Sequence, residues 1–162
     1  MKKALYTPFN FVINYCIDIR FSDSPKSRGR TAVPIIFKYH NAPQKYLEVS
    51  FSGCVDDSQH LQAWKDFHNS SKYIKGYDAV VDLSEADITK ITSEGLRTVL
   101  EYKNAHYKKN NITGTRVAVF APRPLLFGLS RMYDSLDYES NEEVMVFGDK
   151  EQAMSWLLDE NK

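Results

Sequence analysis

The segment YDAVVDLSEADITKITSEGL, residues 77–96, decides the fold of this chain. Residues 78–83 form a short β-branched run, which is typical of a strand covered on both faces of a sheet. The turn at residues 91–95 then gathers two hydroxyl side chains, a carboxylate and a glycine, which favour the start of a helix. The segment therefore predicts a buried strand, a loop and a helix.

Several local signals specify where this helix starts. The Thr92 side chain can cap the helix, and Ile91 and Leu96 occupy the positions of a hydrophobic staple. Glu94 lies in the first turn, where the helix dipole favours negative charge. Ser93 is then expected as the first helical residue, at the corner where the loop meets the helix.

Two further strand-then-helix units follow. Residues 116–120 and 143–147 are apolar strands, and Pro122 and Pro124 open the helix between them. That helix carries an apolar stripe that we interpret as core, formed by Leu125, Leu126, Leu129, Met132, Tyr133 and Leu136. The last helix starts near Asp149, and its buried face is expected to hold Ala153, Trp156 and Leu157.

The pattern of the N-terminal part predicts strands before the first helix. Residues 10–21 and 35–39 are strand-like, and residues 46–51 form a further strand that is expected to end at Gly53 and to pair in a hairpin. Residues 56–58 then cap a helix that runs to Ser70. Taken with the later units, this predicts one α/β domain over residues 1–162. It has a mostly parallel or mixed central sheet, about four helices lying mainly on one face, and an N-terminal antiparallel extension.

Composition narrows the functional classes. Lys plus Arg and Asp plus Glu balance at 21 each, so no overall positive field favours nucleic acid, and no nucleic-acid partner is expected. The basic segment at residues 26–30, with Lys26, Arg28 and Arg30, is interpreted as a solvated loop. The chain shows neither a transmembrane segment nor an export signal, and we expect it to be cytoplasmic.

Cysteine and histidine spacing predicts no metal site. Cys16 and Cys54 stand apart and are interpreted as buried free thiols of a reducing compartment. His60 and His68 lie on one face of the first helix but about 12 Å apart along its axis, too far to bind one ion. Both are interpreted as partly exposed, and neither a metal nor a cofactor is expected.

Six segments together resemble a known family: residues 77–83, 92–97, 117–122, 127–133, 146–147 and 153–157. They are similar to the small bacterial STAS/CRAL-TRIO-like proteins, which have the fold of the sulfate-transporter and anti-sigma-factor-antagonist domain. The resemblance covers roughly residues 46–158, with residues 9–13 like the family's opening strand and an insertion at about 20–45. It implies a STAS-like fold.

The resemblance also implies a regulatory position. True anti-sigma-factor antagonists carry an Asp-Ser-Ser-Gly-Leu turn whose first serine is phosphorylated. Ser93 matches that serine and Gly95 the glycine, so Ser93 is the candidate modification site. Thr92 replaces the family's aspartate and Glu94 its second serine, so the charges around the serine differ from the family pattern.

Three functions remain open. The first is a non-enzymatic regulatory module that binds a protein partner near Thr92, Ser93, Glu94 and Gly95, or forms a homodimer. The second is a carrier of a small apolar ligand or lipid, which requires an apolar cavity lined by the helix at residues 125–136. The third is an unrecognised enzyme, which requires carboxylates to converge with Ser93.

Two pairs of residues serve to separate these functions. An exposed Phe127, with Arg131 one turn later, would favour an interface on the helix at residues 125–136. Asp82, at a strand end, and Asp87, in the loop after it, are the acid and base candidates of an enzyme. The chain carries no nucleophile elbow, phosphate-binding loop, dinucleotide fingerprint or zinc-protease motif, so we expect no enzymatic activity.

Overall fold

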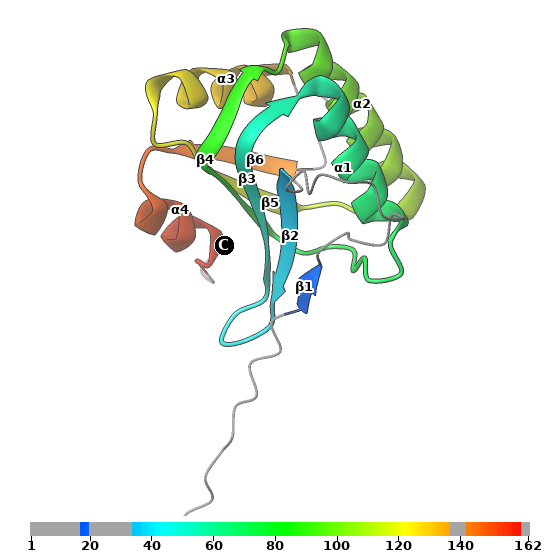
Figure 1. Cartoon of the computed structure of the whole chain (residues 1–162). Helices are drawn as coiled ribbons and strands as arrows, with labels where there is room; N and C mark the ends of the chain where they lie inside the picture. Colours follow the sequence, from blue (N-terminus) through cyan, green and yellow to red (C-terminus); the bar gives the residue numbers. More distant parts are fainter. Residues whose placement is uncertain (1–16, 20–33, 137–141, 160–162) are drawn as a thin grey trace, which may run out of the picture.

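The computed structural model describes residues 17–19, 34–136 and 142–159. Within them the chain forms one sheet of six strands, covered by four helices (Figure 1). The strands are β1 (Ile17–Ile19), β2 (Ile35–His40), β3 (Tyr46–Asp56), β4 (Ala79–Lys90), β5 (Thr115–Phe120) and β6 (Glu142–Phe147). The helices are α1 (Asp57–Asn69), α2 (Ser93–Asn110), α3 (Pro124–Leu136) and α4 (Lys150–Leu157).

The sheet is mixed, as predicted, and its strands follow sequence order from β1 to β6. β1 pairs with β2 and β2 with β3 in antiparallel fashion, which confirms the predicted hairpin and N-terminal extension. β3, β4, β5 and β6 run parallel, with Val81 beside Val119 and Val119 beside Val146. The rest of the strand predicted at residues 10–21, the basic segment at residues 26–30 and Cys16 lie outside the described residues.

The strand order explains where the helices lie. Each parallel connection steps to the next strand in the same direction, and because such crossovers are right-handed, their helices fall on one face. α1, α2 and α3 are these crossover helices, and Trp64, Leu96 and Leu126 of the three join one buried cluster. α4 follows the last strand and covers the opposite face of the sheet (Figure 1).

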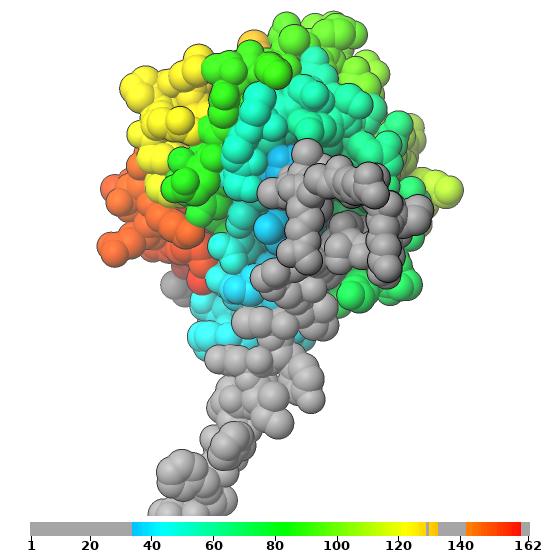
Figure 2. Space-filling view, in the orientation of Figure 1, coloured from blue at the N-terminus to red at the C-terminus, as the bar shows by residue number. Residues whose placement is uncertain are grey.

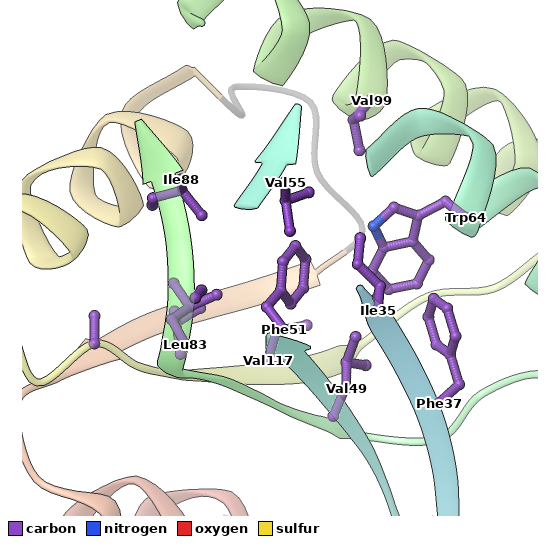
Figure 3. Close-up of a cluster of buried hydrophobic side chains, with 14 of the residues drawn as sticks. Ile35, Phe37, Val49, Phe51, Val55, Trp64, Leu83, Ile88, Val99 and Val117 are labelled. Carbon is purple, nitrogen blue, oxygen red and sulfur yellow. The ribbon is translucent and has the colours of Figure 1, made fainter. Parts of the chain in front are cut away.

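The main core lies between the sheet and the three crossover helices. Figure 3 shows side chains of β2, β3 and β4 in this core, with Ile35 and Phe37 beside Trp64 of α1. Phe37 stacks on Phe67 with ring centroids 4.1 Å apart and meets Trp64 edge-on at 5.1 Å. A smaller core on the other face joins Val80 and Ala118 to α4.

β3 and β4 are longer than the sequence predicted. Gly53 does not end β3, because the strand passes through it with a left-handed φ of 65° and continues to Asp56. β4 runs on to Lys90, so Asp87 lies in a strand and the loop prediction for it was wrong. The polar residues in the second half of β4 suggested a loop. They lie in a strand because β3 and β4 continue to pair beyond the end of β5, where one face of the two strands is exposed to solvent.

A bulge aligns the far end of β4 with the core. Ser50 pairs with Asp82 and Ser52 with Glu85, so β4 holds one extra residue between them. The extra residue reverses the alternation of side chains, and Ala86 and Ile88 therefore join the core beneath the helices.

The helix starts follow the predictions. Thr92 is the N-cap of α2 and Ser93 its first residue. Pro124 is the first residue of α3, and Asp149 caps α4 by accepting a hydrogen bond from the Gln152 N–H. Ala153 and Leu157 are buried as expected, and Trp156 is half-buried.

Four burial predictions were wrong. His60 and His68 are each only 7% exposed, because aromatic side chains of α2 and the sheet cover them. Leu125 is 59% exposed, so the predicted core stripe of α3 does not begin there, whereas Leu126 is buried. Cys54 is exposed because it lies on the extended end of β3. The side chains of Leu129, Tyr133 and Leu136 lie outside the described residues.

Candidate functional site

The predicted turn at Thr92 is tied to the start of α1. Asp57 is the first residue of α1, and its Oδ1 accepts the Thr92 backbone N–H at 2.8 Å. Its Oδ2 accepts the Thr92 hydroxyl at 2.6 Å. The Thr92 hydroxyl oxygen accepts the Gly95 N–H at 3.0 Å, which caps α2. One carboxylate therefore joins the first turns of two helices.

Gly95 is required by this contact. A Cβ atom on Gly95 would lie 1.9 Å from Oδ1 of Asp57 and 2.0 Å from its Cγ, well inside van der Waals contact. Gly95 is itself buried, although the turn around it is exposed. The family resemblance placed a glycine here, and the structure supplies its physical reason.

The turn forms an exposed corner of the molecule. Thr92, Ser93 and Glu94 are all exposed, as the first hypothesis requires. Nearby, residues of β4 reach the surface between α3 and β3 in the space-filling view (Figure 2). At this corner Ser93 presents a hydroxyl group to solvent and Glu94 presents a carboxylate.

Gly95→Ala is expected to lower the free energy of unfolding by about 1–3 kcal/mol, since the added methyl group displaces a hydrogen-bonded carboxylate. In an Asp57→Ala background the same change should be neutral or should stabilise by up to about 1 kcal/mol, because alanine is the better helix former. Urea unfolding of the four proteins measures both effects. An equal cost of Gly95→Ala in the two backgrounds would show that Asp57 does not set the requirement for glycine.

Asp82 lies away from this corner, on the α4 face of the sheet. Its Oδ2 accepts a hydrogen bond from the Lys150 ammonium at 2.6 Å, and its Oδ1 accepts the Ser84 hydroxyl at 2.6 Å and the Ser84 N–H at 2.9 Å. Burial raises the pKa of the Asp82 carboxyl, but the bonds from Lys150 and Ser84 outweigh burial and lower it. Asp82 is thus an ionised carboxylate that ties β4 to α4.

The Asp87 side chain also forms local hydrogen bonds. Its Oδ1 accepts the Thr89 hydroxyl at 2.7 Å and the Thr89 N–H at 3.1 Å, and these bonds lower the pKa of its carboxyl. Within residues 34–136 and 142–159, neither Asp82 nor Asp87 forms a hydrogen bond with Ser93. The structure therefore does not bring the proposed acid, base and hydroxyl into contact.

A cavity of about 80 Å³ lies between the sheet and the crossover helices. Trp64, Leu83 and Val117, all visible in Figure 3, belong to its mainly apolar lining. The predicted cavity wall, the helix at residues 125–136, contributes only Ser130 among the described lining residues. His60, which sequence reasoning placed partly in solvent, is part of the wall.

A buried ion pair borders this region. The Lys103 ammonium lies 2.6 Å from Oε2 of Glu142, and both side chains are only 4% exposed. The Tyr107 hydroxyl donates to Oε1 of Glu142 at 2.5 Å, and the ammonium lies 4.5 Å from the centre of the Trp64 ring. Sequence reasoning missed Lys103, although it continues the apolar face of α2 one turn after Leu100.

Phe127 and Arg131 are both exposed on α3, and Phe127 retains 39% of its surface. Leu125 is more exposed and adds apolar surface at the same end of the helix. The exposure of Phe127 is the condition that the sequence analysis set for an interface on this helix. A homodimer formed through this surface stays a prediction.

The described residues present neither a metal-binding cluster nor a membrane-spanning helix. The described residues contain no cluster of three or more His, Cys, Asp or Glu side chains placed to bind a metal ion. Among the described helices, none combines the length and the apolar character needed to span a bilayer.

Comparison with known proteins gives a fold neighbour and no family match. No family model and no curated protein matches the chain. A similar solved structure is that of an uncharacterized protein of the DUF3478 family from Shewanella loihica PV-4, described as having a SpoIIAA-like fold. The two share 18% identity over 76% of this chain and 91% of that chain, with a TM-score of 0.49.

Proposed function

We propose that this chain is a non-enzymatic, cytoplasmic binding module that regulates a protein partner through the corner formed by residues 92–95. The observation that carries the proposal is the fixed and exposed turn, in which Asp57 holds Thr92 while Ser93 and Glu94 face solvent. A surface that is already ordered loses little conformational entropy on binding, which favours recognition at this corner.

The charge at this corner favours a basic partner surface. Asp56 caps α1, Asp57 joins the two helices, and Glu94 lies in the first turn of α2, so the joined helix starts carry three carboxylates. Lys90 is paired with Asp56 along the strands and offsets part of this charge. A partner that presents Arg or Lys side chains complements the remaining negative charge.

Phosphorylation of Ser93 would act by competition for the α2 N-terminus. A phosphate adds about 1.5–2 negative charges and is stabilised by the free N–H groups at a helix start. Here Asp57 already accepts the Thr92 N–H, and Glu94 adds a second negative charge in the same turn. A phosphate on Ser93 would repel Asp57 and loosen its bonds to Thr92, which gives modification a route to alter the docking corner.

Variants that place a positive charge at the corner test whether it is the docking site. Glu94→Arg and Ser93→Arg are expected to abolish or reduce capture of the partner from native lysate at least about tenfold, because each places positive charge where a basic surface must dock. Glu101→Arg, on an exposed part of the same helix, is the matched control and should capture as the parent does. Quantitative mass spectrometry of the captured proteins measures the ratio.

The same experiment can contradict the proposal. If every protein captured by the parent is also captured equally by the Ser93→Arg and Glu94→Arg variants, the corner is not the docking site. Ser93→Asp and Ser93→Ala are added to test regulation. Equal capture by these two variants would remove modification of Ser93 from the proposal and leave the docking site in place.

The cavity gives no support to transport of a whole lipid. A volume of about 80 Å³ accommodates only about six water-sized groups, far fewer than the acyl chain of a lipid contains. A carrier function is therefore compatible with a much smaller ligand only.

A further inference from the structure

The outer surface of α3 is apolar at one end and basic one turn later. Leu125 retains 59% of its surface and Phe127 retains 39%. Gly128 and Arg131 continue the same surface, because residues three and four apart lie on one side of a helix, and both are exposed. We call residues 125, 127, 128 and 131 the α3 face. Water is the less favourable surrounding for its apolar side chains, so a partner that covers them gains stability.

Gly128 points to close approach of another molecule. It lies inside α3, where glycine is the least favourable residue apart from proline. Its φ is not left-handed, and a Cβ atom on it would meet no described atom within 4 Å. An alanine would therefore fit the described structure and favour the helix. A residue without a side chain at this exposed position lets a second surface come close to the helix backbone.

Exposed carboxylates of β4 lie beside the start of α3. Nη2 of Arg123, the residue before α3, donates to the Ala86 carbonyl oxygen and so joins the two elements. Glu85 and Asp87, directly before and after Ala86, are both exposed. Hydrogen bonds from Thr89 lower the pKa of the Asp87 carboxyl, and the nearby charge of Arg123 lowers it further. Figure 2 shows β4 (green) and α3 (yellow) side by side on one surface of the molecule.

We propose that the α3 face binds the β4 carboxylates of a second copy of this chain, in a dimer with two-fold symmetry. The molecule carries an apolar and basic surface directly beside an acidic one, so a rotation by 180° can place each surface on its complement in the other copy. This charge complementarity is the reason to choose a second copy as the occupant.

The dimer gives each feature of the α3 face a role. Arg131 of one copy lies against Glu85 of the other, and this ion pair occurs twice. Leu125 and Phe127 leave water, and the open position at Gly128 lets the second copy reach the helix. The contact does not use the corner at residues 92–95, so the inference goes beyond the proposed function and can fail without it.

Sedimentation equilibrium of the full chain between about 1 and 300 μM measures the association. The unaltered protein should show a reversible monomer–dimer equilibrium with a dissociation constant of about 10 μM, as expected of a small interface. Gly128→Gln should weaken it at least about tenfold, because the long side chain holds the second copy away from α3. Ser155→Gln, at an exposed position of α4, is the matched control and should associate as the parent does.

The glutamine variant also separates association from folding. Glutamine forms helices better than glycine does, so the urea midpoint of Gly128→Gln should equal or exceed that of the parent. The comparison is made at about 1 μM, where both proteins are monomers if the dissociation constant is near 10 μM. Weaker association together with an unchanged or higher midpoint assigns the loss to the interface.

A charge exchange tests which surfaces meet. Arg131→Glu alone and Glu85→Arg alone should each weaken association about tenfold or more, because like charges then face each other in both contacts. An equal mixture of the two variants should associate about as tightly as the parent, because both contacts again join opposite charges. Glu94→Arg, which changes the docking corner, should associate as the parent does, so the dimer and the docking corner are tested separately.

Three outcomes would overturn the proposal. The first is an unaltered protein that stays monomeric to about 300 μM, which would leave the α3 face to a different protein. The second is association of Gly128→Gln that matches the parent, which would place the contact elsewhere. The third is a mixture of Arg131→Glu and Glu85→Arg that associates no better than either variant alone, which would show that α3 does not meet β4.

Discussion

Replacing Lys103 by methionine is expected to lower the free energy of unfolding by about 3–5 kcal/mol. The Lys103 ammonium and the Glu142 carboxylate are 2.6 Å apart and almost completely buried. Methionine keeps much of the side-chain volume but leaves the Glu142 charge without its counterion in a site of low polarity. Urea unfolding at pH 7, followed by Trp64 and Trp156 fluorescence, measures the loss.

A double-mutant cycle separates the ion pair from general packing. Glu142→Gln removes the charge and keeps an oxygen that can accept the Tyr107 hydroxyl. The double variant Lys103→Met/Glu142→Gln should therefore cost clearly less than the sum of the single changes. Lys108→Met, on the exposed side of α2, is the control and should change stability by less than about 0.5 kcal/mol. A loss below about 1 kcal/mol for Lys103→Met would show that the pair is solvated.

Local chemistry allowed the sequence to predict most of the elements. Thr92, Asp149 and Pro124 each define a helix start through groups within one turn, so their positions were predicted correctly. The sheet order follows from the alternation of strands and helices and from the handedness of the crossovers. The ends of β3 and β4 were missed because their pairing with each other, and not their composition, keeps them extended.

The candidate site was predicted only in part, since its contacts join distant parts of the sequence. Asp57 is 35 residues from Thr92, and nothing in the local pattern indicates that it holds the turn. His68 is buried because α2 places His106 against it, with ring centroids 3.8 Å apart. Lys103 could have been found, because it falls on the buried face of α2 between Leu100 and Tyr107, and a charge there needs a partner.

Lowering the pH from 7 to 5 is expected to reduce the free energy of unfolding by about 3–4 kcal/mol, mainly through His60 and His68. Burial lowers the pKa of His60 from 6.5 to about 4. Burial, followed by the charges of His106 and Lys103, lowers the pKa of His68 to about 3. In the unfolded chain both titrate near 6.5, so below that pH the unfolded state binds protons that the folded state does not.

This difference in protonation sets both the direction of the change in stability and the pH range over which it occurs. Both histidines are neutral in either state well above pH 6.5, where they do not affect stability. Stability falls as the pH drops below 6.5, and this dependence ends only below the folded values near 4 and 3. The lowered pKa of the Asp82 carboxyl acts in the same direction at still lower pH, because the unfolded carboxyl takes up its proton first.

Urea unfolding between pH 5 and 7 measures this dependence, and His68→Phe identifies its source. Phenylalanine suits the aromatic surroundings of His68, which include Tyr73, Tyr102 and His106. The variant should lose about half of the pH dependence, since one of the two titrating groups is gone. Near pH 5.5 the parent should take up about two protons on unfolding, and the variant about one. A denaturation midpoint that stays constant from pH 7 to 5 would mean that the two imidazoles take up protons as readily in the folded protein as in the unfolded chain. They would then lack the buried contacts with α2 and the sheet described above.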